Sequence, residues 1–211
     1  MFIGKSVLFL GPSKSALEGF EYSVISSYDF IARTNKYLET KEYQLDNNKN
    51  RCDILFLNSN CVRFYSDSSN SREIFGKKIF VKLDSEKRFL LSKYNNLQIE
   101  SLQHYWNKNC AKFYPHKPYY GTVAIDYLRN NCSKLDIAGI DFYDNGFSRK
   151  DIYVDGYYDL EETSKQESQH SIDKDLMFTK DMLRENKNIN LLHTTKDIFV
   201  RKIRELDCDE K

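Results

Sequence analysis

The chain has 211 residues, of which 30% are charged, and its 32 Lys and Arg residues nearly balance its 31 Asp and Glu residues. This length predicts one domain with a sizeable core. The small net charge excludes a global attraction to nucleic acid or to a membrane surface, so an anionic ligand must be captured locally.

The cysteines and the apolar runs predict an intracellular protein. The five cysteines are scattered, without a C-x-x-C pair, which argues against a disulfide framework and against a zinc site. The sequence shows neither a signal peptide nor an apolar run of roughly 20 residues that could span a bilayer. We therefore expect a cytoplasmic protein, and leave peripheral membrane contact and self-association open.

Short apolar runs alternate with helical patterns along the chain. The expected strands are residues 6–10, 28–33, 53–57, 78–82, 135–140 and 189–192. The expected helices are residues 99–106, 122–128, 171–185 and 196–206, with a connector at 107–114. This alternation predicts a single α/β domain over residues 1–211, built on a Rossmann-like, doubly wound, mainly parallel sheet.

A turn of Gly11, Pro12 and Ser13 follows the first expected strand and leads into a short helical pattern at 16–20. Ligands of open α/β sheets bind beyond the carboxyl ends of the strands. Such a turn places free backbone N–H groups at the start of a helix, which suits a phosphate. An ordinary strand-to-helix turn has the same signature, and this alternative stays open.

Two asparagines stand at the ends of neighbouring expected strands. Asn35 follows the second strand and Asn58 follows the third. The amide group offers both a donor and an acceptor, which suits a sugar or the edge of a base. Each residue alone is more typical of a turn or of a helix N-cap. Their matched positions beside the Gly11 turn favour a ligand site.

The fifth expected strand ends in polar and aromatic residues, among them Asp141 and Tyr143. Residues 144–169 follow without a steady period and lead to a histidine, His170, at the start of a helical pattern. A strand tip, a long connecting segment and a returning histidine predict an active site under a lid at about 144–169. A histidine before a helix is also typical of capping, and Asp141 is also typical of a turn.

Taken together, these motifs resemble those of the sialyltransferases, most closely bacterial glycosyltransferase family 42 and more distantly the animal-type family 29. The strongest match is the run Gly-Ile-Asp-Phe-Tyr-Asp-Asn-Gly at 139–146, with His170 and Ser171 downstream. Weaker matches are the Arg-Thr-Asn at 33–35, the strand that ends in Asn58, and residues 117–124. The pieces occur in the family's order over nearly the whole chain.

The resemblance implies one nucleotide-sugar-binding domain with a glycosyltransferase-A-like fold. It implies an inverting enzyme without metal or cofactor, which moves sialic acid from CMP-sialic acid to a hydroxyl group of an oligosaccharide or glycolipid. Two alternatives remain: a transferase for another CMP-activated acid sugar such as Kdo, and a non-catalytic nucleotide-binding protein.

The resemblance also assigns roles to individual residues. Tyr143 would donate to the leaving phosphate, and His170 would be the base. Histidine suits this role because its unperturbed pKa is roughly 6.5. The chain departs from the family where Phe9 and Leu10 replace Gly-Asn, and where Tyr119 and Tyr120 replace small hydroxyl residues. The residues expected to contact the donor are Gly11, Pro12, Ser13, Asn35, Asn58, Lys117, Gly121, Thr122 and Asp141.

Overall fold

The computed structural model describes residues 2–13, 20–35, 51–66, 77–142 and 169–209. The strands are β1 (Phe2–Leu10), β2 (Phe30–Thr34), β3 (Ile54–Leu57), β4 (Lys78–Val81), β5 (Gln98–Ser101), β6 (Cys132–Ala138) and β7 (Ile189–Leu191). The helices are the 3-10 helix η2 (Tyr22–Ser27), α3 (Ser59–Ser66), α4 (Asp84–Lys93), α5 (Gln103–Phe113), α6 (Tyr120–Arg129), α8 (Ile172–Glu185) and α9 (His193–Asp209).

All seven strands belong to one sheet in the order β5-β4-β3-β2-β1-β6-β7, and every neighbouring pair is parallel. The chain builds outward from β1 to β5 and then returns to place β6 on the other side of β1. The direction of winding therefore reverses between β1 and β6. In open α/β sheets, the ligand crevice lies at the carboxyl edge beside such a switch point.

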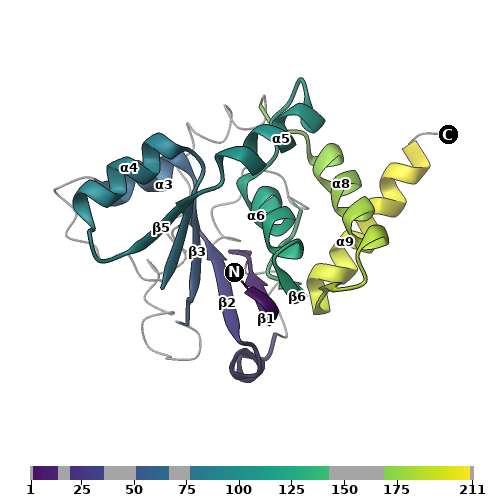
Figure 1. Cartoon of the computed structure of the whole chain (residues 1–211). Helices are drawn as coiled ribbons and strands as arrows, with labels where there is room; N and C mark the ends of the chain where they lie inside the picture. The colour runs from purple at the N-terminus through teal and green to yellow at the C-terminus, as the bar shows by residue number, and fades with distance from the viewer. Residues whose placement is uncertain (1, 14–19, 36–50, 67–76, 143–168, 210–211) are drawn as a thin grey trace.

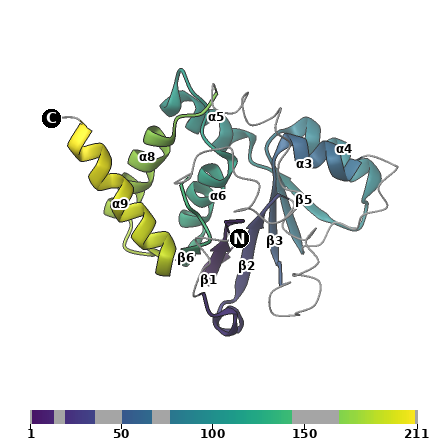
Figure 2. The same cartoon turned by 180° about the vertical axis from the view of Figure 1, so that it is seen from behind.

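Apolar side chains cover both faces of the sheet. On β1, Val7 and Phe9 join the core under α6 and α8, whereas Leu8 and Leu10 join a cluster with η2. Helices α3 and α4 cover the outer part of the second face, over β3 and β4. The two helical layers are visible on either side of the strands (Figure 1 and, from behind, Figure 2). Burial on both faces explains why these strands are continuous apolar runs.

The predicted doubly wound α/β fold is confirmed, and one stretch of the secondary-structure prediction is wrong. Residues expected as the start of a helix form the edge strand β5, and α5 runs through the expected connector. In β5 only Ile99 is buried, between the exposed Gln98 and Glu100. Four residues with one buried side chain are too few for an alternation to be recognised.

Both α6 and α8 run against the direction of the strands. Each connects to the amino end of the next strand, so each begins at the carboxyl edge of the sheet. The residues that precede these helices therefore lie at the same edge as the strand tips. No helix in the described part of the chain combines the length and the apolar character needed to cross a membrane.

Candidate active site

The tips of β1 and β6 touch at the switch point through their backbones. The N–H of Gly11 donates to the oxygen of Ala138 (2.8 Å), and the N–H of Ser13 donates to the oxygen of Gly139 (3.0 Å). A Cβ atom on Gly11 would lie 2.2 Å from the oxygen of Gly139, which itself has a φ of +75°. Only glycine at position 11 permits this close approach.

The N–H groups of Gly11 and Ser13 are therefore not free. The N–H groups of Gly11 and Ser13 donate to backbone oxygens at the end of β6, and Pro12 has no N–H group. The prediction of a phosphate site therefore depends on the N–H groups of the expected helix start that follows. The helical pattern expected at 16–20 lies outside the described residues, apart from Phe20.

Asn35 and Asn58 lie side by side at the tips of β2 and β3, as predicted from their positions. The N–H of Asn35 donates to the oxygen of Phe56 (2.7 Å), and its Oδ1 accepts the N–H of Asn58 (3.0 Å). The Oδ1 of Asn58 accepts the N–H of Cys61 (2.9 Å), which makes it a cap for α3. Asn35 has a φ of 57°, a conformation that asparagine tolerates. Both side-chain oxygens thus accept backbone N–H groups and stabilise the chain at the strand tips.

The segment after β6 turns twice before it leaves the described part of the chain. Gly139 and Phe142 both have positive φ values, 75° and 49°. Asp141 between them is buried, and the Phe142 ring packs against Phe199 of α9 with ring centres 5.2 Å apart. Tyr143 and residues 144–168 of the predicted lid lie outside the described residues.

His170 pairs with the segment that leads into α6. Lys117 and His170 form a parallel bridge, in which the N–H of Lys117 donates to the oxygen of Gln169 (2.7 Å). Ser171 then caps α8, since its hydroxyl oxygen accepts the N–H of Lys174 (3.3 Å). The cap and the bridge fix the backbone on both sides of the imidazole. Two of the predicted site residues, Lys117 and His170, are thus brought together.

The hydrogen bond of His170 determines its tautomer. Its Nδ1 lies 2.8 Å from the backbone oxygen of Lys117. Because a carbonyl oxygen can only accept, Nδ1 carries the proton, and Nε2 of the neutral ring is left as a proton acceptor. Burial lowers the pKa of His170, the hydrogen bond to Lys117 opposes this shift, and the nearby positive charges of Lys117 and Lys82 add to it. The ring is therefore a neutral base at neutral pH.

The two tyrosines that depart from the family pattern lie in different places. The ring of Tyr119 stacks on His170, with centroids 4.3 Å apart and planes 15° apart. Tyr120 instead points into the core, where its hydroxyl donates to the oxygen of Phe80 (3.3 Å). Tyr119 thus covers one face of the imidazole, a contact that the sequence did not reveal.

Thr122 joins the first turns of α6 and α8. Its hydroxyl donates to Oδ1 of Asp175, which also accepts a hydrogen bond from the backbone of Tyr119. Burial raises the pKa of Asp175 to about 8, although both hydrogen bonds oppose this shift. The other oxygen, Oδ2, has no hydrogen-bond partner among the described residues. Asp175 is therefore a protonated acid at neutral pH. At Gly121, beside Thr122 in the first turn of α6, an added Cβ would meet no atom within 4 Å.

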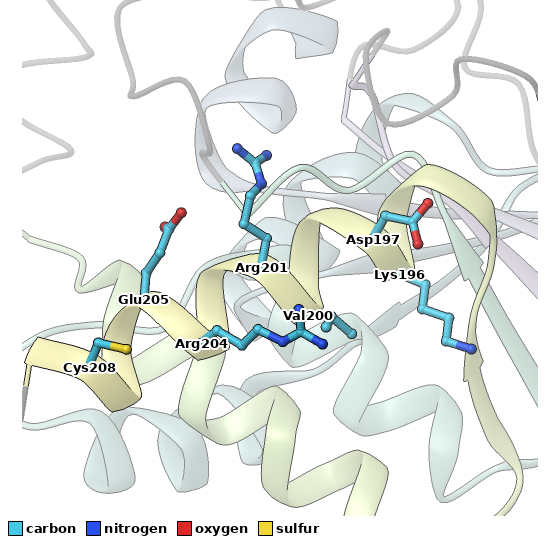
Figure 3. A pocket seen from close by; sticks show the side chains of 7 residues that line it. All are labelled: Lys196, Asp197, Val200, Arg201, Arg204, Glu205 and Cys208. Atoms are coloured by element: carbon cyan, nitrogen blue, oxygen red, sulfur yellow. The ribbon is translucent and has the colours of Figure 1, made fainter.

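A broad hollow lies along α9, away from the predicted residues. It has a volume of about 1030 Å³, and Figure 3 shows acidic, basic and apolar side chains along it: Lys196, Asp197, Val200, Arg201, Arg204, Glu205 and Cys208. None of the described predicted site residues lines it. Within the described residues, no three His, Cys, Asp or Glu side chains gather in a way that could hold a metal ion.

The fold resembles that of mammalian sialyltransferases. The structure of one such enzyme in complex with Gal-beta-1-3GalNAc-ortho-nitrophenol matches with a TM-score of 0.55 and 13% identity, over 90% of this chain and 69% of that one. A second mammalian sialyltransferase structure gives the same TM-score and coverage at 14% identity. At these identities the likeness shows a shared fold, and the expected closer kinship with bacterial family 42 stays a prediction. No protein-family model and no curated protein matches the sequence.

Proposed function

We propose that this chain is an inverting, metal-independent glycosyltransferase. It would move an acid sugar, with sialic acid as the first candidate, from its CMP-activated form to a hydroxyl group of a glycan. One observation carries the proposal: His170 stands at the carboxyl edge of a sialyltransferase-like sheet as a neutral imidazole with Nε2 as its acceptor. The shared fold supports a glycosyl donor, and the site chemistry supports base-assisted transfer.

In the proposed reaction, the acceptor oxygen attacks the anomeric carbon from the face opposite the phosphate. The new carbon–oxygen bond forms while the bond to the phosphate oxygen breaks, so the configuration inverts and CMP leaves as an anion. Nε2 of His170 takes the proton of the acceptor hydroxyl. Tyr143 stays the predicted donor to the leaving phosphate, where a hydrogen bond strengthens as negative charge develops.

The proposal keeps more than one acid sugar, because the chain departs from the family pattern at Tyr119 and Tyr120. Tyr120 is turned into the core, whereas the ring of Tyr119 lies against His170, the proposed base. A stacked aromatic ring in place of a small hydroxyl residue suits more than one acid sugar, so CMP-Kdo remains in the proposal beside CMP-sialic acid.

A non-catalytic nucleotide-binding protein is the second candidate. The departure at Phe9 and Leu10 from the family's Gly-Asn favours it, because these apolar side chains cannot donate to a leaving phosphate. The neutral His170 weighs against it, since a binding protein has no need of a proton acceptor at that edge.

The test is release of CMP from CMP-sialic acid and from CMP-Kdo, each with and without a galactosyl disaccharide and in the presence of a chelator. This acceptor is chosen because one structural neighbour was solved with such a compound. We expect release that depends on the acceptor and survives the chelator, and a product with inverted configuration. Release without acceptor would indicate a hydrolase, and release from neither donor would favour the non-catalytic candidate.

A further inference from the structure

The segments that lead into α6 and α8 run parallel to each other and are joined at two points. The bridge between Lys117 and His170 joins them first, and the hydrogen bond between Thr122 and Asp175 joins them again further along both segments. Both pairs are 53 residues apart in the chain, so the two segments keep one register. The two helices continue side by side from there (Figures 1 and 2). Asp175 thus lies at the far end of the contact that begins at His170.

Tyr119 lies between these two points and is held by its backbone. It is the N-cap of α6, and its oxygen accepts the N–H of Val123 (3.2 Å). Its own N–H donates to the carboxyl group of Asp175. These two hydrogen bonds fix the backbone on both sides of the Tyr119 Cα atom. The side chain starts from that atom, so the place of the ring on His170 depends on the bond to Asp175.

Asp175 is itself held firmly. Its N–H donates to the oxygen of Ser171 (3.2 Å) in the first turn of α8, and only 5% of the residue is exposed. Its Oδ1 accepts both hydrogen bonds from the other segment, one from Thr122 and one from Tyr119. Without this carboxyl group, both donors would lose their acceptor and would have to find water instead. The start of α6 would then be free to move relative to α8.

We propose that Asp175 is a positioning residue for His170 and acts through Tyr119. Oδ1 of Asp175 holds the backbone of Tyr119 so that the phenol ring covers one face of the imidazole. The hydrogen bond from Nδ1 to the oxygen of Lys117 holds the edge of the same imidazole. Held at a face and at an edge, the ring keeps Nε2 in one direction. The catalytic consequence rests on the proposed function, whereas the position of the ring does not.

The direction of Nε2 matters because a base must lie within hydrogen-bond reach of the proton that it takes. A single hydrogen bond at Nδ1 leaves the imidazole free to swing out of its plane, and the stacked ring of Tyr119 prevents this motion. A displacement of about 1 Å can lower a reaction rate by as much as about 10²-fold. Asp175 would therefore affect the rate without touching the substrate.

The test is NMR of the His170 ring in the full chain, without any ligand. Protons over the face of an aromatic ring are shielded, so the stack moves the His170 ring signals upfield, and Tyr119→Leu defines their position without it. We expect Asp175→Ala to move the signals at least halfway to that position. Asp175→Asn should leave them unchanged, because the amide oxygen accepts the same two hydrogen bonds. Unchanged signals in Asp175→Ala, or an equal shift in Asp175→Asn, would overturn the proposal.

A control and a second variant guard against loss of the fold. Asp173→Ala, at an exposed position two residues earlier on α8, should leave the His170 signals unchanged, and a shift equal to that of Asp175→Ala would overturn the proposal. If Asp175→Ala fails to fold, the double variant Thr122→Val with Asp175→Leu replaces it. This pair puts apolar groups of similar shape in place of both partners, a change that folded proteins tolerate well. Retention of the upfield shift in the double variant would also overturn the proposal.

Transfer by the same samples tests the catalytic consequence separately. We expect Asp175→Ala to lower kcat about tenfold with little change in the KM for the acceptor, and Asp175→Asn to restore kcat. If no sample transfers a sugar while the NMR signals behave as expected, the proposed function is refuted and the positioning of His170 by Asp175 stands. Normal kcat in Asp175→Ala, together with transfer by the unmodified chain, would refute the positioning role alone.

Discussion

His170 is the residue on which the proposed chemistry depends. Replacement by alanine removes the proton acceptor but leaves the strand tips intact, so we expect transfer to fall by about 10²-fold or more while CMP binding is retained. The comparison is His104→Ala, at an exposed histidine of α5, which should transfer at the normal rate. Normal transfer by His170→Ala would show that His170 is not the base.

The lowered pKa of His170 predicts the shape of the pH profile. The base acts when neutral, and burial together with nearby positive charge shifts its pKa below the ordinary value of 6.5. We expect kcat/KM for transfer to rise with pH, to show its inflection below 6.5, and to be flat from there to neutral pH. An inflection above 6.5 would mean that another group titrates, or that the imidazole is stabilised in its charged form.

Asp175 predicts a pH-dependent stability. Its pKa is raised from 3.8 to about 8 by burial, so folding at neutral pH requires proton uptake by this carboxyl group. Stability is therefore greatest below the unfolded pKa and falls as pH rises toward the folded pKa. An amide needs no such proton, so the stability advantage of Asp175→Asn should grow by roughly 1.4 kcal/mol per pH unit between these two values. Urea denaturation at several pH values measures the free energy of unfolding of both proteins. If their difference did not change with pH, Asp175 would not be protonated in the folded chain.

At the scale of elements, the contact between the β1 and β6 tips predicts a steric requirement at Gly11. A methyl group there would collide with the backbone oxygen of Gly139, which cannot move without disturbing β6. We expect Gly11→Ala to lower the free energy of unfolding by more than about 2 kcal/mol. Unchanged stability would show that the tips can separate.

Gly121 provides a matched comparison, because it lies in the first turn of α6 and a methyl group there meets no atom within 4 Å. Gly121→Ala should stabilise the fold by roughly 0.5–1 kcal/mol, since alanine suits a helix better than glycine. If the donor passes over this turn, the same variant should bind CMP-sugar more weakly despite its higher stability. Unchanged donor affinity would show that Gly121 does not contact the donor.

The strands that fill the core could be predicted from sequence, whereas β5 could not. The tips of β1 to β4 end buried runs such as residues 54–57, and burial on both faces makes such runs visible in the sequence. In β5, Ile99 is the single buried side chain, so the helical pattern around Trp106 dominated the prediction.

The candidate site was predictable only where a residue follows a strand or begins a helix. The places of Asn35 and Asn58 at strand tips and of His170 before α8 were predicted in this way, and their roles stay predictions. The stack of Tyr119 on His170 and the bond of Thr122 to Asp175 join segments about 50 residues apart, and no local pattern encodes them.

At the scale of the whole molecule, the sheet brings distant residues to one edge. The tips of five strands and the starts of α6 and α8 converge there, although they span the chain from Gly11 to Asp175. The parallel order of the strands creates this edge, and the imidazole and basic groups near it are features of this chain. We propose that this edge binds a CMP-activated sugar.

Calorimetric titration with CMP, without added metal, tests this claim most directly, with UDP and GDP as controls. We expect selective binding of CMP by the unmodified chain and by His170→Ala, since the imidazole would act on the acceptor. Absence of binding, or binding of a diphosphate alone, would contradict it and would mean that the Gly11 turn, with its N–H groups bound to β6, no longer accepts the donor.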